Sequence, residues 1–89
     1  MHSALVIATP PLTIEGKQSW PGLQTETIRT IRACEGGVVL SESTWLIPLH
    51  SAKGLLTFSS TLDRISQEQG SFQVLFFETE PSFVCSEPR

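Results

Sequence analysis

Hydrophobic residues along the chain predict four β-strands. Residues 4–8 are continuously apolar, which is typical of a strand buried on both faces. Residues 38–40 and 44–49 flank a short polar turn, so they are expected to pair as a hairpin. Residues 72–77 form the last long apolar run. These segments supply the strands of one sheet.

A first helix is predicted for residues 22–35, where apolar residues recur at intervals of three and four. The pair Gly36-Gly37 suits the left-handed conformation that ends many helices. Residues 12–21 are expected to form a loop, because Gly16 and Pro21 both interrupt regular structure.

A second helix is predicted between Ser51 and Gly70. Ser51 is a residue type that caps helix starts, and Gly70 favours helix termination. The helix has one regular apolar stripe, which we expect to pack into the protein core. The residues of this stripe are Leu55, Phe58, Leu62 and Ile65.

The order of these elements is strand, helix, strand, strand, helix, strand. It predicts an α+β fold of the ferredoxin-like, split βαβ type, in which two helices cover one face of an antiparallel sheet. A winged helix, the main alternative, needs three helices before its hairpin. Residues 1–89 then form a single domain with a flexible tail at 86–89, and residues 83–85 are a candidate short fifth strand.

Composition restricts the possible partners. The net charge of -3 and a pI of about 5.2 argue against a non-specific nucleic-acid binder, which needs a basic surface. Charged residues make up only 17% of the chain, which favours self-association. No apolar run approaches the ~20 residues that span a bilayer, and no signal peptide is evident, so we expect a cytoplasmic protein without membrane contact.

Titratable residues give little support to catalysis. Asp63, the sole aspartate, is expected on a solvated helix surface, and His2 is expected to be disordered. His50 is a weak candidate for a general base, although a capping or surface role fits it better. Glu78 and Glu80 have strand spacing and suit either a hard cation or the polar end of a strand. No phosphate loop, zinc spacing or catalytic triad is present, so no cofactor is predicted.

Tryptophans and cysteines are interpreted as structural. Trp20 and Trp45 could stack on nucleic-acid bases, but in a small domain they are expected in the core. Cys34 and Cys85 have no metal-site spacing and are expected to be reduced thiols.

A Ser-Thr-Trp-Leu-Ile stretch at 43–47 is followed by a helix with Leu55, Leu62 and Asp63. Gln-Val-Leu-Phe follows at 73–76. In this order the chain resembles the small ferredoxin-fold proteins related to the second CRISPR-associated protein. It is most similar to their SinR-like and virulence-associated protein D-like relatives. The resemblance extends over residues 4–84.

Family members pair through their sheets, and a short fifth strand often crosses to the partner, so the resemblance implies a homodimer with Phe83, Val84 and Cys85 at its interface. Nuclease members carry an aspartate just after the first strand. Here Ala8-Thr9-Pro10 occupies that place, and a threonine hydroxyl cannot supply the charge of a magnesium site.

The expected function is therefore a non-catalytic scaffold or adaptor that binds nucleic acid or a protein partner in a defence or mobile-element setting. Two alternatives remain open. One is a metal-dependent endoribonuclease with an altered site that uses His50, Glu78 or Glu80. The other is an acidic inhibitor that occupies a nucleic-acid site on another protein, for which the net charge of -3 is modest.

Overall fold

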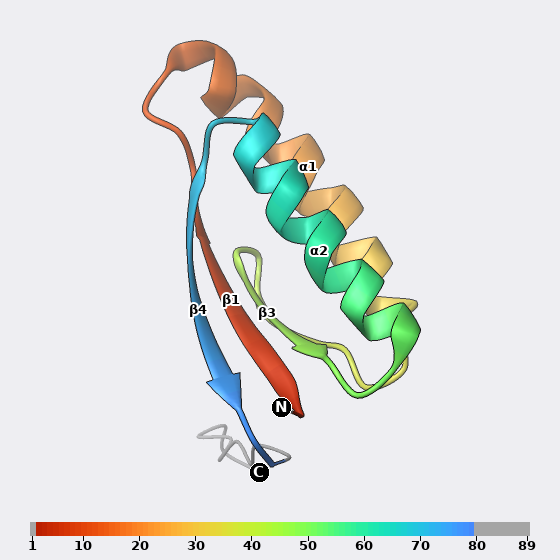
Figure 1. Ribbon diagram of the computed structural model, residues 1–89. Coiled ribbons are helices and arrows are strands. Elements are labelled where there is room, and N and C mark those ends of the chain that lie inside the picture. The colour runs from red at the N-terminus through yellow and green to blue at the C-terminus, as the bar shows by residue number, and fades with distance from the viewer. Residues whose placement is uncertain (1, 80–89) are drawn as a thin grey trace, which may run out of the picture.

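A computed structural model describes residues 2–79, which form an antiparallel four-stranded sheet with two helices on one face (Figure 1). The elements are β1 (Ser3–Thr9), α1 (Ile14–Arg32), β2 (Val38–Ser41), β3 (Thr44–Pro48), α2 (Ala52–Gln67) and β4 (Ser71–Phe77). The strand order is β2-β3-β1-β4. The structure therefore confirms the predicted α+β, ferredoxin-like arrangement.

β1 is a central strand, as its continuous apolar sequence predicts. It pairs with β3 on one side and with β4 on the other, both antiparallel. Val6 is fully buried and lies between Trp45 of β3 and Val74 of β4 in one cross-strand row. All three belong to the core beneath the helices.

α1 begins at Ile14, and the prediction of a loop over residues 12–21 is wrong. The Thr13 side chain caps the helix by accepting a hydrogen bond from the Gly16 N–H at 3.1 Å. Pro21 lies inside the helix, where it removes one backbone donor, and the first turns change direction (Figure 1). Burial of Trp20 in the core helps to stabilise this extra segment.

α2 packs through a line of mostly small residues. Gly54, Thr57, Thr61 and Ile65 are its buried residues. A Cβ atom at Gly54 would lie 2.0 Å from the carbonyl oxygen of Pro48, so glycine is needed for this close approach to the sheet. The Thr57 and Thr61 hydroxyls donate to backbone carbonyls one turn earlier, at 2.8 Å each, which satisfies these buried groups.

This close approach changes which residues of the predicted stripe are buried. Ile65 is buried as expected, and Phe58 and Leu62 are half-buried against the core. Leu55 is 51% exposed, so its assignment to the core is wrong. The helix turns its small residues inward, which moves Leu55 to the flank.

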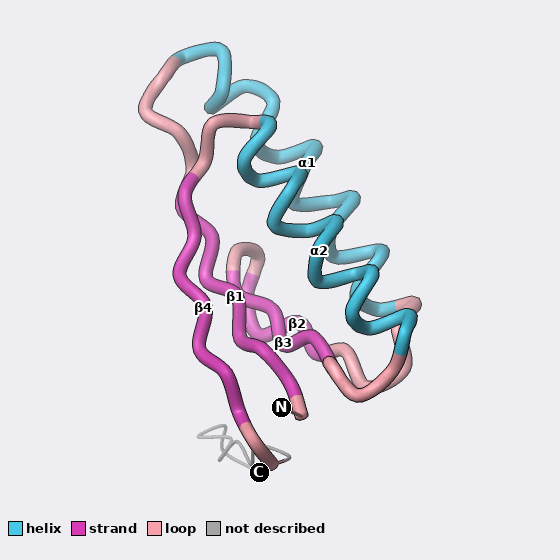
Figure 2. The backbone as a smooth tube through the Cα atoms, viewed as in Figure 1, coloured by secondary structure: helices cyan, strands magenta, loops and turns pink. Residues whose placement is uncertain are grey.

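The opposite face of the sheet, here called the open face, carries no helix from the described residues (Figure 2). A row of aliphatic residues crosses it through direct strand pairing. In order across the sheet the row is Val38, Leu46, Leu5 and Leu75. None of the four strands contains a charged residue.

Several predicted features lie outside the described residues. They are Glu80, the fifth strand and interface formed by Phe83, Val84 and Cys85, and the tail at 86–89.

Candidate functional site

The candidates His50 and Glu78 follow the ends of β3 and β4, at the end of the sheet where β1 begins. Both strands run antiparallel to β1, so this arrangement also brings His2 to the same end. The His2 N–H donates to the Phe77 carbonyl at 2.7 Å, and the Leu49 N–H donates to the His2 carbonyl at 2.8 Å. This histidine end of the sheet is the strongest cluster of sequence-derived candidates.

His2 and His50 stack on each other. Their ring centroids lie 4.7 Å apart and the ring planes differ by 17°. The prediction that His2 is disordered is wrong, because two backbone hydrogen bonds tie it to the neighbouring strands. No local sequence signal links these histidines, since strand register alone brings them together.

The stack is poorly arranged for metal binding. Imidazole binds metals through nitrogen lone pairs that lie in the ring plane. Because the two rings are nearly parallel and stacked, their lone pairs lie in two separate planes and do not converge on one ion. Among residues 2–79 no group of three His, Cys, Asp or Glu residues could hold a metal. The cation-site hypothesis for Glu78 with Glu80 stays a prediction, since Glu80 lies outside this range.

Thr9, which the resemblance predicts to lie where nucleases carry an aspartate, is the exposed last residue of β1 and pairs with Ser71. Asp63 is exposed on α2 and accepts a hydrogen bond from Gln67 at 3.0 Å, as expected for a surface carboxylate. The single aspartate of the chain is therefore a surface residue of α2.

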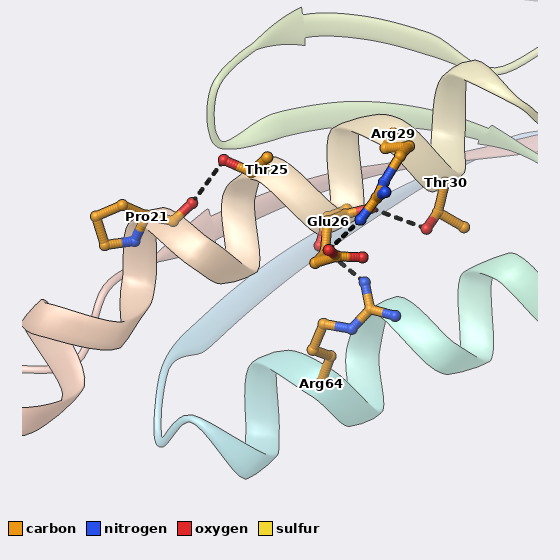
Figure 3. Close-up of polar contacts among 7 residues, drawn as sticks. Pro21, Thr25, Glu26, Arg29, Thr30 and Arg64 are labelled. Atoms are coloured by element: carbon orange, nitrogen blue, oxygen red, sulfur yellow. Dashed lines mark hydrogen bonds and ion pairs between the residues drawn. The ribbon is translucent and has the colours of Figure 1, made fainter.

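Charged residues of the helix layer make local structural contacts (Figure 3). Arg29 forms an ion pair with Glu26 within α1. Arg64 of α2 reaches α1, where it donates to the buried Thr27 hydroxyl at 3.5 Å. Arg29 and Arg64 thus have partners inside the helix layer.

The tryptophans are core residues, as predicted. Trp20 and Trp45 are both buried, so neither offers a ring for base stacking. Their Nε1 atoms are buried without a hydrogen-bond partner in the described part of the chain. Cys34 is a buried free thiol, while Cys85 falls outside the described residues.

Neither of the two helices in residues 2–79 has both the length and the hydropathy needed to cross a bilayer. The resemblance to CRISPR-associated-protein-like families rests on the residues quoted above and stays a prediction. Comparison with protein-family models and with curated proteins finds no match to this chain.

Proposed function

We propose that this protein is a non-catalytic, homodimeric scaffold or adaptor that self-associates through its sheet. The observation that supports this proposal best is an uncharged sheet with large apolar side chains exposed on both of its outer strands. These side chains are Val38, Leu40, Phe72, Leu75 and Phe76.

Single exposed apolar residues are normal on protein surfaces, but a group on one sheet is a feature of interaction sites. None of the four described strands carries a charge that would oppose contact with another copy. Self-association of small domains usually produces a twofold dimer.

The partner of the scaffold is proposed from the family resemblance, which implies nucleic acid or a protein in a defence or mobile-element setting. The net charge of -3 favours a protein, or a local nucleic-acid contact, over non-specific binding along a duplex.

The absence of catalysis is proposed from the residues that the fold brings together. The histidine end joins two stacked imidazoles, and the first strand ends at Thr9 without a carboxylate. A magnesium-dependent nuclease needs carboxylate oxygens at its metal. The cytoplasmic location remains part of this proposal.

Light scattering tests the assembly. We expect a mass of about twice the 9.8 kDa of the single chain. Truncation after Glu80 should weaken the dimer if Phe83 and Val84 extend the partner's sheet. A monomer at high micromolar concentration would contradict the proposal.

Incubation with labelled RNA and DNA in magnesium or manganese tests the absence of catalysis. We expect no cleavage by the wild-type protein. Metal-dependent cleavage that disappears in Glu78→Gln would instead favour an endoribonuclease.

A further inference from the structure

We propose that the contact between copies is the edge of β4 beyond which no strand of residues 2–79 lies, here called the free edge. At this edge the β4 strand of a second copy pairs antiparallel about a twofold axis at Val74. This inference rests on the proposed self-association and names the surface that carries it. It joins the two four-stranded sheets into one continuous sheet.

Strand register determines which backbone groups of β4 face outward. In an antiparallel sheet each residue directs both its N–H and its C=O to the same side, and successive residues alternate. The Ala8 N–H donates to Ser43, so the even-numbered residues of β1 face β3 and the odd-numbered residues face β4. The β4 residues opposite those odd positions are Ser71, Gln73, Leu75 and Phe77. Phe72, Val74 and Phe76 therefore direct their backbone groups to the free edge.

The same three residues place apolar side chains on the helix side of the sheet, opposite Ala8, Val6 and Ala4. Val74 packs against the core. Phe72 and Phe76 remain 38% and 50% exposed. Phe58 of α2 touches Phe76 edge-to-face, with ring centroids 6.0 Å apart, but α2 does not cover either phenylalanine completely.

The β4 sequence is self-complementary about Val74. A twofold axis there places Phe72 opposite the partner's Phe76, and Phe76 opposite the partner's Phe72. Val74 faces the partner's Val74. The outward backbone groups of all three residues then meet matching groups, and the exposed aromatic rings pack against each other across the axis.

Charge does not oppose this pairing. β4 contains no charged residue, and the nearest acid beyond its end is Glu78. In the proposed register Glu78 lies opposite the partner's Gly70. Like charges therefore do not face each other across the axis.

Edge pairing accounts for exposed aromatic surface that packing through the open face would leave uncovered. On the open face Leu46 is buried, Leu5 is half-buried, and Val38 and Leu75 are exposed. Face-to-face packing would leave Phe72 and Phe76 exposed. Edge pairing covers both rings and satisfies the backbone groups that an edge strand otherwise leaves unpaired.

Cysteine cross-linking in the full-length chain tests the register, in a background with Cys34→Ala and Cys85→Ser. Gln73→Cys places two thiols about 8 Å apart across the axis, within reach of a short bis-maleimide. Ser71→Cys, on the same face of the same strand, places them roughly 20 Å apart. We expect Gln73→Cys to give covalent dimers at several times the yield of Ser71→Cys. Equal yields would overturn the proposal.

Charge substitution provides a second test that does not depend on the linker. In Phe72→Lys/Phe76→Lys, like charges face each other across the axis. In Phe72→Lys/Phe76→Glu, opposite charges face each other. We expect the Lys/Lys variant to lose at least tenfold in dimer affinity relative to the Lys/Glu variant by light scattering. Thermal unfolding monitored by circular dichroism verifies that both variants are folded.

The outcomes separate this inference from the proposed function. A wild-type monomer overturns both. A dimer in which the Lys/Lys and Lys/Glu variants associate equally overturns the edge contact and leaves the scaffold proposal standing. A third outcome is that Gln73→Cys gives no cross-link and truncation after Glu80 weakens the dimer. This outcome overturns β4 pairing and assigns the contact at the edge to the segment around Phe83.

Discussion

The two edges of the sheet differ in how they are protected. β2 is only four residues long, and its pairing with β3 is irregular between Val39 and Ser41. β4 has seven residues, no proline and no charge, and it pairs regularly with β1 along its whole length. Short strands, bulges and charges are common ways in which proteins block pairing at sheet edges.

Only the β4 edge is suited to pairing with another strand. An irregular four-residue strand offers a short and interrupted set of backbone groups. A regular seven-residue strand offers three outward residues in sequence, and those residues carry exposed aromatic rings at Phe72 and Phe76. Sheet composition alone would not separate the two, since both edges are uncharged.

The largest expected loss of stability follows substitution of Trp45, a core residue in the middle of the sheet. Trp45 is fully buried on β3, next to Val39 of β2 and Val6 of β1. Trp45→Ala should lower the free energy of unfolding by roughly 3–5 kcal/mol, because it removes the largest fully buried side chain and leaves a cavity. Chemical denaturation measures this loss. An unchanged midpoint would contradict the described core.

A slightly smaller loss of stability is expected for substitution of a buried residue on α2, the helix beside β4. Ile65 is fully buried on α2, so Ile65→Ala should cost roughly 2–5 kcal/mol of unfolding free energy. Leu55→Ala, on the same helix, should cost less than about 1 kcal/mol because half of that side chain remains in solvent. Denaturation of the two variants in parallel tests the corrected inner side of α2. Equal losses of unfolding free energy in the two variants would instead support the stripe predicted from the sequence, with Leu55 in the core.

A charge placed at each edge tests the comparison directly. Phe76→Lys should weaken dimerisation at least tenfold, about 1.4 kcal/mol, because it puts a charge into the proposed interface. Val38→Lys on β2, at a similarly exposed position, should leave dimerisation unchanged. Sedimentation or light scattering over a dilution series measures both. A larger effect at Val38 would reverse the assignment of the two edges.

The smallest expected effect tests whether the edges are packed equally well in the monomer. Val39 and Val74 are half-buried on the helix side of β2 and β4. Val39→Ala and Val74→Ala should each lower unfolding free energy by about 1 kcal/mol, since each loses two partly buried carbon atoms. Similar losses, measured under conditions that keep the protein monomeric, would show that the edges differ in association and not in packing.

Much of the fold could be predicted from local pattern. The apolar run at residues 4–8 indicated a central strand, and the described β1 has that position. Ser51 caps α2 by accepting from the Gly54 N–H at 3.0 Å, and Gly36 adopts the left-handed φ of 88° after α1. Each of these features depends on the chemistry of one short segment.

The candidate sites were less predictable because they depend on register. His2 and His50 are remote in sequence and meet only because β1 pairs with β3. α1 extends back across Pro21 to Ile14, since burial of Trp20 and the Thr13 cap offset the intrinsic cost of proline in a helix. A breaker residue is a local signal, and here tertiary packing outweighs it.

Residue type and short-range spacing were enough to predict the order of the elements, the helix cap at Ser51 and the lack of charge in the four described strands. Packing between α2 and the sheet determines that small residues, not Leu55, form the inner side of α2, since the approach of Gly54 to Pro48 sets the helix rotation. The tertiary structure also determines that Phe72, Val74 and Phe76 face the free edge. That outcome depends on how β4 pairs with β1 and on the fact that no described strand lies beyond it.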